Sequence, residues 1–158
     1  MMIQPTQKQL DILMKLTEVE QSMGRLYEVY AELFPDYKEF WLSLVTEEKQ
    51  HAQWINDLHS YIVQGIASFD SARFNTVAIQ TFINSMDDEL GKAKNHEISL
   101  TNALSMSLRF EESLLEHKFF QIVSGDSPKF KQLLSNLAEA TQKHIEKVRK
   151  TLNTYRHI

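Results

Sequence analysis

The chain has 158 residues, of which 42% are hydrophobic and 24% charged, and its formal net charge is −4. This length suits one domain with a hydrophobic core, and the charge provides no basic surface for nucleic acid. The absence of cysteine excludes disulfides, iron–sulfur clusters, thiolate catalysis and zinc sites built on cysteine. No signal-peptide pattern and no apolar run of about 20 residues is present, so we expect a cytoplasmic protein with no membrane span.

Long segments without glycine or proline predict a single all-α domain over residues 1–158. A capping box at Thr6 and Gln9 opens the first helix, Pro35 ends it, and Asp36 with Glu39 resembles the cap of the second. Residues 66–74 have the composition of a loop, and Ser127 is expected to cap the last helix. The expected helices cover residues 6–34, 36–65, 76–93, 97–123 and 128–157.

The spacing of these helices predicts their topology. Two short connections would form antiparallel hairpins at about 6–65 and 97–157, joined by a long crossover at 66–96 that carries the shorter helix. A single long crossover is typical of ferritin-like bundles. The expected fold is therefore a ferritin-like antiparallel four-helix bundle with a short extra helix in the crossover.

Each of the four long helices has an apolar stripe with the spacing of heptad core positions, and polar residues interrupt each stripe near its middle. A carboxylate is rarely buried unless it is paired or binds a metal, because removing its water costs several kcal/mol. A lone core histidine is more often simply hydrogen-bonded, but a set on four helices favours metal ligation. The interrupting residues are Glu20, Glu48 with His51, Glu112, and Thr141 with His144.

The two halves of the chain also resemble each other. The spacing of Leu16, Glu20 and Tyr27 recurs at residues 108, 112 and 119, and LVTEEKQH at 44–51 matches LAEATQKH at 137–144. This repeat pairs Glu20 with Glu112 and His51 with His144. We expect the paired residues to meet near a pseudo-two-fold axis.

This arrangement of glutamates and histidines resembles the ferritin-like di-iron carboxylate proteins. The spacing from Glu20 to Tyr27 and the segment EEKQHA are most similar to the rubrerythrin branch. The resemblance implies that Glu48 bridges two metal ions and that Tyr27 donates a hydrogen bond to a ligand. It also implies that Glu20 and Glu112 are terminal carboxylate ligands. His51 and His144 would each supply an imidazole.

The resemblance also implies a function. Proteins of this kind bind one or two iron ions and reduce peroxide or dioxygen, and they often form homodimers. Manganese or zinc would suit the same ligands. Because rubredoxin-type iron needs cysteine, redox turnover here would require a separate electron-donor protein.

The sequence departs from the family at one ligand. Thr141 stands where a second bridging glutamate would be, so three carboxylates would leave one positive charge on two divalent ions. Four alternatives would account for this excess positive charge: weaker metal binding, a single ion, recruitment of Glu116 one turn after Glu112, or an exogenous anion. Alternatively, Thr141 fills the core and bonds back to its own helix.

Three functional classes follow from these alternatives. The first is an oxidoreductase acting on peroxide or dioxygen, and the second is a protein that handles metal without efficient turnover. The third is a degenerate bundle that serves as a protein-interaction module.

Overall fold

The computed structural model describes residues 4–113 and 120–156, and helices dominate them, which confirms the all-α prediction. Two short strands and two 3₁₀ turns connect the helices. The elements in chain order are α1 (Gln7–Leu33), η1 (Pro35–Tyr37), α2 (Lys38–Val63), β1 (Ala67–Ser68), η2 (Ser71–Arg73), α3 (Thr76–Lys94), α4 (Leu100–Glu112), β2 (Ser124–Gly125) and α6 (Pro128–Arg156).

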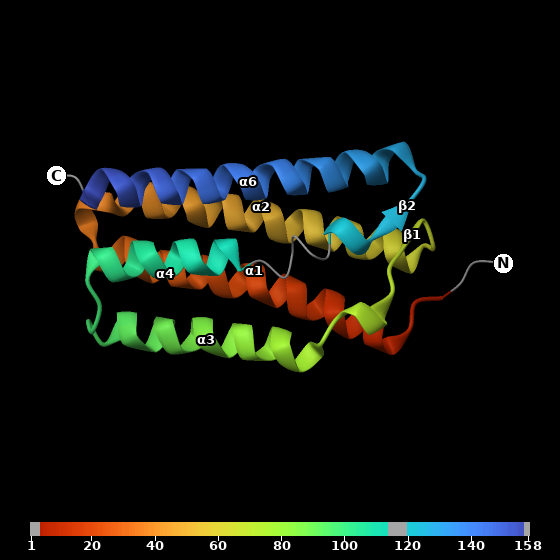
Figure 1. The fold of residues 1–158 in the computed structure, drawn as a ribbon, viewed down its shortest axis with the longest axis horizontal. Coiled ribbons are helices and arrows are strands. Elements are labelled where there is room, and N and C mark those ends of the chain that lie inside the picture. Colours follow the sequence, from red (N-terminus) through yellow and green to blue (C-terminus); the bar gives the residue numbers. More distant parts are fainter. Residues whose placement is uncertain (1–3, 114–119, 157–158) are drawn as a thin grey trace.

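The helices lie lengthwise beside one another (Figure 1). The chain runs along α1, returns along α2, runs parallel to α1 again in α3, returns in α4 and runs back in α6. Helix α1 packs against α2 and α3, while α6 packs against α2 and α4. The helix expected at about residues 76–93 is confirmed as α3, and it lies along α1 (Figure 1).

Local sequence signals explain most helix starts. The capping box of Thr6 and Gln9 is present at α1, and Asn75 caps α3 by accepting bonds from two backbone N–H groups. The expected cap at Asp36 is wrong. Residues 35–37 form the 3₁₀ turn η1, and Tyr37 precedes α2 without a side-chain cap.

The expected continuous helix over 97–123 is also wrong. A capping box of Ser99 and Asn102 starts α4 at Leu100, and α4 ends at Glu112. Ser113 follows it, and its hydroxyl donates a hydrogen bond of 2.5 Å to the carbonyl of Arg109. Such side-chain bonds compete with the helical backbone pattern.

A two-stranded antiparallel pair ties the loop after α2 to the loop before α6. Ala67 pairs with Gly125 and Ser68 with Ser124. A Cβ atom at position 125 would lie 2.7 Å from the carbonyl oxygen of Ile66, so this close approach requires glycine. Strands of two residues show no periodicity, which is why the sequence did not indicate them.

The core runs the length of the bundle. Aromatic rings fill one end of it, where Trp41 lies 5.7 Å from Tyr27 and 4.8 Å from Tyr30 between ring centroids. The predicted stripe of α2 is buried along its whole length, including Glu48 and His51. No helix among the described residues combines the length and apolar character needed to cross a membrane.

Candidate metal centre

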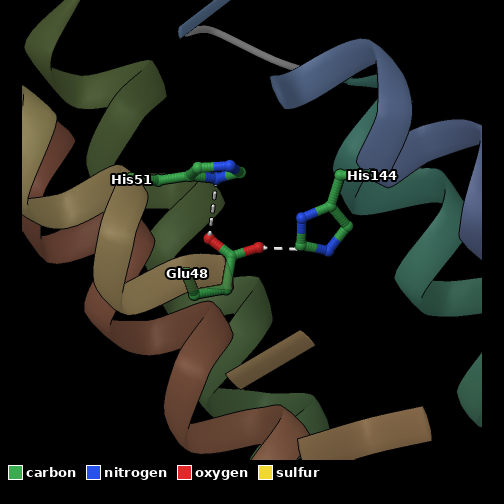
Figure 2. Close-up of side chains that lie close together, drawn as sticks. All are labelled: Glu48, His51 and His144. Carbon is green, nitrogen blue, oxygen red and sulfur yellow. Dashed lines mark ion pairs between the residues drawn. The ribbon is translucent and has the colours of Figure 1, made fainter. Parts of the chain in front are cut away.

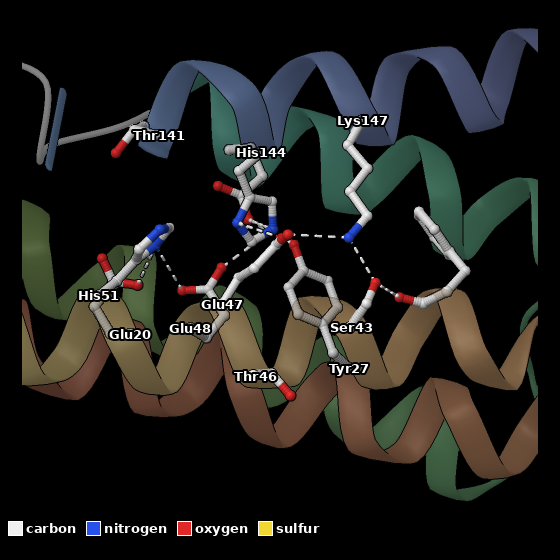
Figure 3. Close-up of polar contacts among 12 residues, drawn as sticks. Glu20, Tyr27, Ser43, Thr46, Glu47, Glu48, His51, Thr141, His144 and Lys147 are labelled. Carbon is white, nitrogen blue, oxygen red and sulfur yellow. Dashed lines mark hydrogen bonds and ion pairs between the residues drawn. The ribbon is translucent and has the colours of Figure 1, made fainter. Parts of the chain in front are cut away.

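Five buried ionisable side chains from four helices converge in the middle of the bundle. Each is 5% exposed or less. Helices α1 and α4 provide one glutamate each, α2 provides a glutamate and a histidine, and α6 provides a histidine. Figure 3 shows those from α1, α2 and α6 pointing into one space. The five side chains, called the buried cluster below, are Glu20, Glu48, His51, Glu111 and His144.

Glu48 lies at the centre of the buried cluster, between the two imidazoles (Figure 2). Its Oε2 is 3.6 Å from Nδ1 of His51, one turn further along α2, and its Oε1 is 3.3 Å from Nε2 of His144. One ligand atom from each of the three residues lies within 4.8 Å of the others. Ligand atoms about 2.1 Å from one ion lie up to about 4.2 Å apart. A small adjustment of these side chains can therefore enclose a metal ion.

The other two carboxylates flank this centre. Glu20 Oε2 lies 3.8 Å from Nδ1 of His51, and Glu111 Oε1 lies 3.1 Å from Nε2 of His144. The Tyr27 hydroxyl donates a hydrogen bond of 2.6 Å to the same Glu111 oxygen. This bond fixes the orientation of the Glu111 carboxylate, and the ring of Trp54 stacks on His51 with 6.1 Å between centroids.

The electrostatic environment keeps His144 neutral. Burial lowers the pKa of His144 below its usual 6.5, and the nearby carboxylates of Glu111 and Glu47 oppose this only in part. Both ring nitrogens are buried, and neither makes a hydrogen bond within the part of the chain that the structure describes. A neutral imidazole with an available nitrogen is the form that binds metals.

The phenol of Tyr27 stays protonated for related reasons. Burial raises its pKa well above 10, and the charges of Glu111 and Glu48 raise it further. Tyr27 is therefore a hydrogen-bond donor at neutral pH. The carboxylate that accepts its hydrogen bond belongs to Glu111.

The charge of the buried cluster fits a cation. Its three carboxylates carry −3 when ionised, and His144 contributes nothing. The sum is −3 with a neutral His51 and −2 with a protonated one. Because isolated buried charge is strongly unfavourable, a divalent ion would stabilise this arrangement.

Comparison of the chain with protein-family models, with curated proteins and with solved structures gave no match. The resemblance to ferritin-like di-iron proteins therefore stays a prediction. The donor set can be judged on its own chemistry: carboxylate oxygens and imidazole nitrogens suit iron, manganese and zinc. The buried cluster can hold a metal ion, and its geometry leaves the identity of that ion open.

The predicted inward position of Glu112 is wrong. Its side chain is 45% exposed and pairs with Arg149 on α6 at 2.6 Å. Its neighbour Glu111 occupies the position near His144 instead. Two adjacent glutamates differ by about 100° around a helix. The prediction placed Glu112 in a stripe that continues to residue 119, but α4 ends at Glu112.

Two residues bear on the missing fourth carboxylate: Thr141, which stands in its place, and Glu116, which was considered as a substitute ligand. Thr141 is buried, and its hydroxyl donates a bond of 2.8 Å to the carbonyl of Leu137. The alternative that it fills the core and bonds back to its own helix is confirmed. Glu116 lies outside the described residues.

A second group beside the buried cluster was not recognised in the sequence. Lys147 Nζ lies 3.0 Å from Glu47 Oε1 and 2.6 Å from Ser43 Oγ (Figure 3). The other oxygen of Glu47 is 3.7 Å from Nδ1 of His144, opposite the nitrogen that faces Glu48. This distance is too long for a hydrogen bond, and neither of these two atoms has a hydrogen-bond partner among the described residues. The i, i+4 spacing of Ser43 and Glu47 places them on one face of α2. Their contact with Lys147, one turn after His144, depends on how α2 and α6 pack.

Proposed function

We propose that the protein is a metal-binding protein of the ferritin-like di-iron carboxylate type, similar to rubrerythrins, with iron as its metal. The observation that carries this proposal is the burial of three carboxylates and two imidazoles from four helices in one connected cluster. Such a set is unfavourable by itself and has the donors that iron prefers. Manganese and zinc fit the same donors.

The path of the chain supports the same proposal. Two antiparallel pairs, α1 with α2 and α4 with α6, are joined through α3, which returns the chain along the bundle (Figure 1). This is the connection expected for a bundle with a single long crossover. The ligands come from the four helices of the two pairs, and α3 contributes none of the five.

Each residue has a distinct role in this proposal. Glu48 would contact the metal centrally, with His51 and His144 on either side and Glu20 and Glu111 as flanking carboxylates. Bound iron would supply the electrons that reduce peroxide or dioxygen. The Tyr27 hydroxyl donates a hydrogen bond to Glu111 Oε1. A separate electron-donor protein would reduce the oxidised iron again, because a rubredoxin-type centre needs cysteine and the chain has none.

Thr141 favours a second candidate function, metal handling without efficient turnover. With two divalent ions the three carboxylates leave a net charge of +4 − 3 = +1, which weakens the second site. A single ion leaves −1, and the cluster then resembles a binding site more than a di-iron centre. The two functions differ in reactivity towards peroxide, not in their ligands.

The experiment compares anaerobically Fe(II)-loaded protein with Zn(II)-loaded protein during addition of hydrogen peroxide. The oxidoreductase proposal predicts that peroxide rapidly oxidises the bound Fe(II), which optical absorption monitors. It also predicts repeated turnover once a reductant is supplied. Oxidation without turnover would favour metal handling. A thermal melt that neither metal shifts would refute both functions and favour the interaction module, because a ligand of the native state must stabilise it.

A further inference from the structure

A pocket between α1 and α2 reaches the buried cluster from the surface. Its volume is about 220 Å³, and the side chains of Glu20 and Glu48 form part of its lining. Gly24 and Ala52 line it between the buried glutamates and the exposed rim. Sites for drug-sized ligands measure about 300–1,000 Å³, and one water molecule needs far less space than this pocket offers. The pocket therefore suits a small ligand of a few atoms.

Gly24 keeps this space open. It lies inside α1, where glycine is less favourable than any residue except proline. Its backbone is helical, and a Cβ atom would lie 3.8 Å from Cβ of Glu48, which is an ordinary contact. Neither backbone conformation nor packing requires glycine here. What a larger side chain would remove is the open volume beside Glu48.

The rim of the pocket determines which charge it favours. Arg25 and Lys49 carry positive charge there, and Glu28 carries one negative charge, so the exposed rim is +1. The buried Glu20 and Glu48 bring the whole lining to −1 when all its carboxylates are ionised and no metal is bound. Arg25 Nη2 lies 2.8 Å from Ser22 Oγ, which holds the guanidinium in place. Once a divalent ion is bound by the two buried carboxylates, the lining as a whole becomes positive, and a narrow positive opening attracts anions.

We propose that this pocket is the entry and binding site through which a small monovalent anion reaches the metal at the buried cluster. The inference rests on the proposed function. Glu20 Oε1 and Glu48 Oε2 are shielded from solvent, so their carboxylates must rotate to admit the ligand. Two divalent ions with three carboxylates keep one positive charge, because Thr141 stands where a fourth carboxylate would be. A bound anion would neutralise that charge.

The test uses the full chain loaded with Co(II) and measures azide binding by visible absorption in a stopped-flow instrument. Gly24→Leu, which fills the pocket, should slow azide association about tenfold or more and leave Co(II) affinity within about threefold. Gly91→Leu is the matched control, since Gly91 is an exposed helical glycine of α3 with nothing within 4 Å of its Cβ position. Lys49→Gln should slow association several-fold and reduce its salt dependence.

The outcomes separate the two proposals. If Co(II) binds and neither Gly24→Leu nor Lys49→Gln changes azide association, the pocket proposal is refuted and the metal site stands. If the unmodified protein fails to bind Co(II), the proposed function fails and the anion site fails with it. Should Gly24→Leu not fold, Gly24→Ala serves instead because its Cβ fits, and it should slow azide by a smaller factor than leucine.

Discussion

Replacing Glu48 with glutamine distinguishes a metal ligand from a member of a structural ion pair. Glu48 is buried and lies 3.6 Å from His51 and 3.3 Å from His144. If both imidazoles were charged partners, removing the carboxylate would leave buried positive charge and destabilise the protein by about 3–5 kcal/mol. At about 2–4 °C per kcal/mol for a chain of this size, the Tm would fall by about 6–20 °C.

The structure predicts a different result. His144 is neutral because burial lowers its pKa, so the substitution mainly reduces the repulsion among three buried carboxylates. The metal-free Glu48→Gln protein should be as stable as the unmodified protein, or more stable by up to about 2 kcal/mol. Removing a metal ligand would then leave the fold intact.

Adding metal should reverse the order of stability of the unmodified protein and the Glu48→Gln protein. At a metal concentration of 100 times Kd, the unmodified protein should gain about 2.7 kcal/mol, or about 5–11 °C in Tm. The Glu48→Gln protein should gain little.

The assay is thermal unfolding followed by circular dichroism, with EDTA or with Zn(II), which is redox-inert. Glu112→Gln is the matched control, since Glu112 is exposed and, among the described residues, forms an ion pair across the surface with Arg149. A large loss of stability in metal-free Glu48→Gln, together with no response of the unmodified protein to Zn(II), would refute the reasoning.

Three further predictions concern other residues of the site. Glu111→Gln should weaken metal binding about 10–100-fold by calorimetric titration, and Glu112→Gln should leave it unchanged; weakening by Glu112→Gln and not by Glu111→Gln would instead support Glu112 as the ligand. Thr141→Glu should destabilise the metal-free protein by several kcal/mol and create a tight second metal site, whereas destabilisation that metal does not rescue would show that the core has repacked around threonine. The pKa of His144 is lower in the folded state than its unfolded value of about 6.5. The unfolded chain therefore binds this proton first, and the free energy of unfolding of metal-free protein should fall as the pH drops below about 6.5. Urea unfolding between pH 7.5 and 5.5 measures this slope, which should be shallower in His144→Gln.

The faces of α1 and α2 could be predicted from the sequence because both helices keep one apolar period along their length. The buried position of Glu48 and His51 follows from that period alone. Thr141 and His144 were placed correctly for the same reason on α6. Local periodicity was thus enough to predict the buried position of these four residues.

The error at Glu112 has a physical cause. In the pair Glu111–Glu112, either residue continues an apolar stripe, and the choice depends on where the helix ends. The spacing of the apolar residues does not reveal that α4 ends at Glu112. The pairing of β1 with β2 and the contact of Lys147 with Glu47 were missed because both depend on tertiary packing between distant segments.

The pocket beside Gly24 also could not be predicted. A glycine inside a helix signals only a loss of stability, and its meaning depends on the neighbouring helix. The structure supplies that context by placing Glu48 across from it.

The central claim is that the buried cluster binds a transition metal through Glu48. The most direct test is elemental analysis after anaerobic loading with Fe(II) and removal of free metal, on the unmodified protein and on Glu48→Gln. We predict at least one tightly bound iron per chain in the unmodified protein and a large loss in the variant. An absence of bound metal in the unmodified protein, or equal iron in both, would contradict the claim.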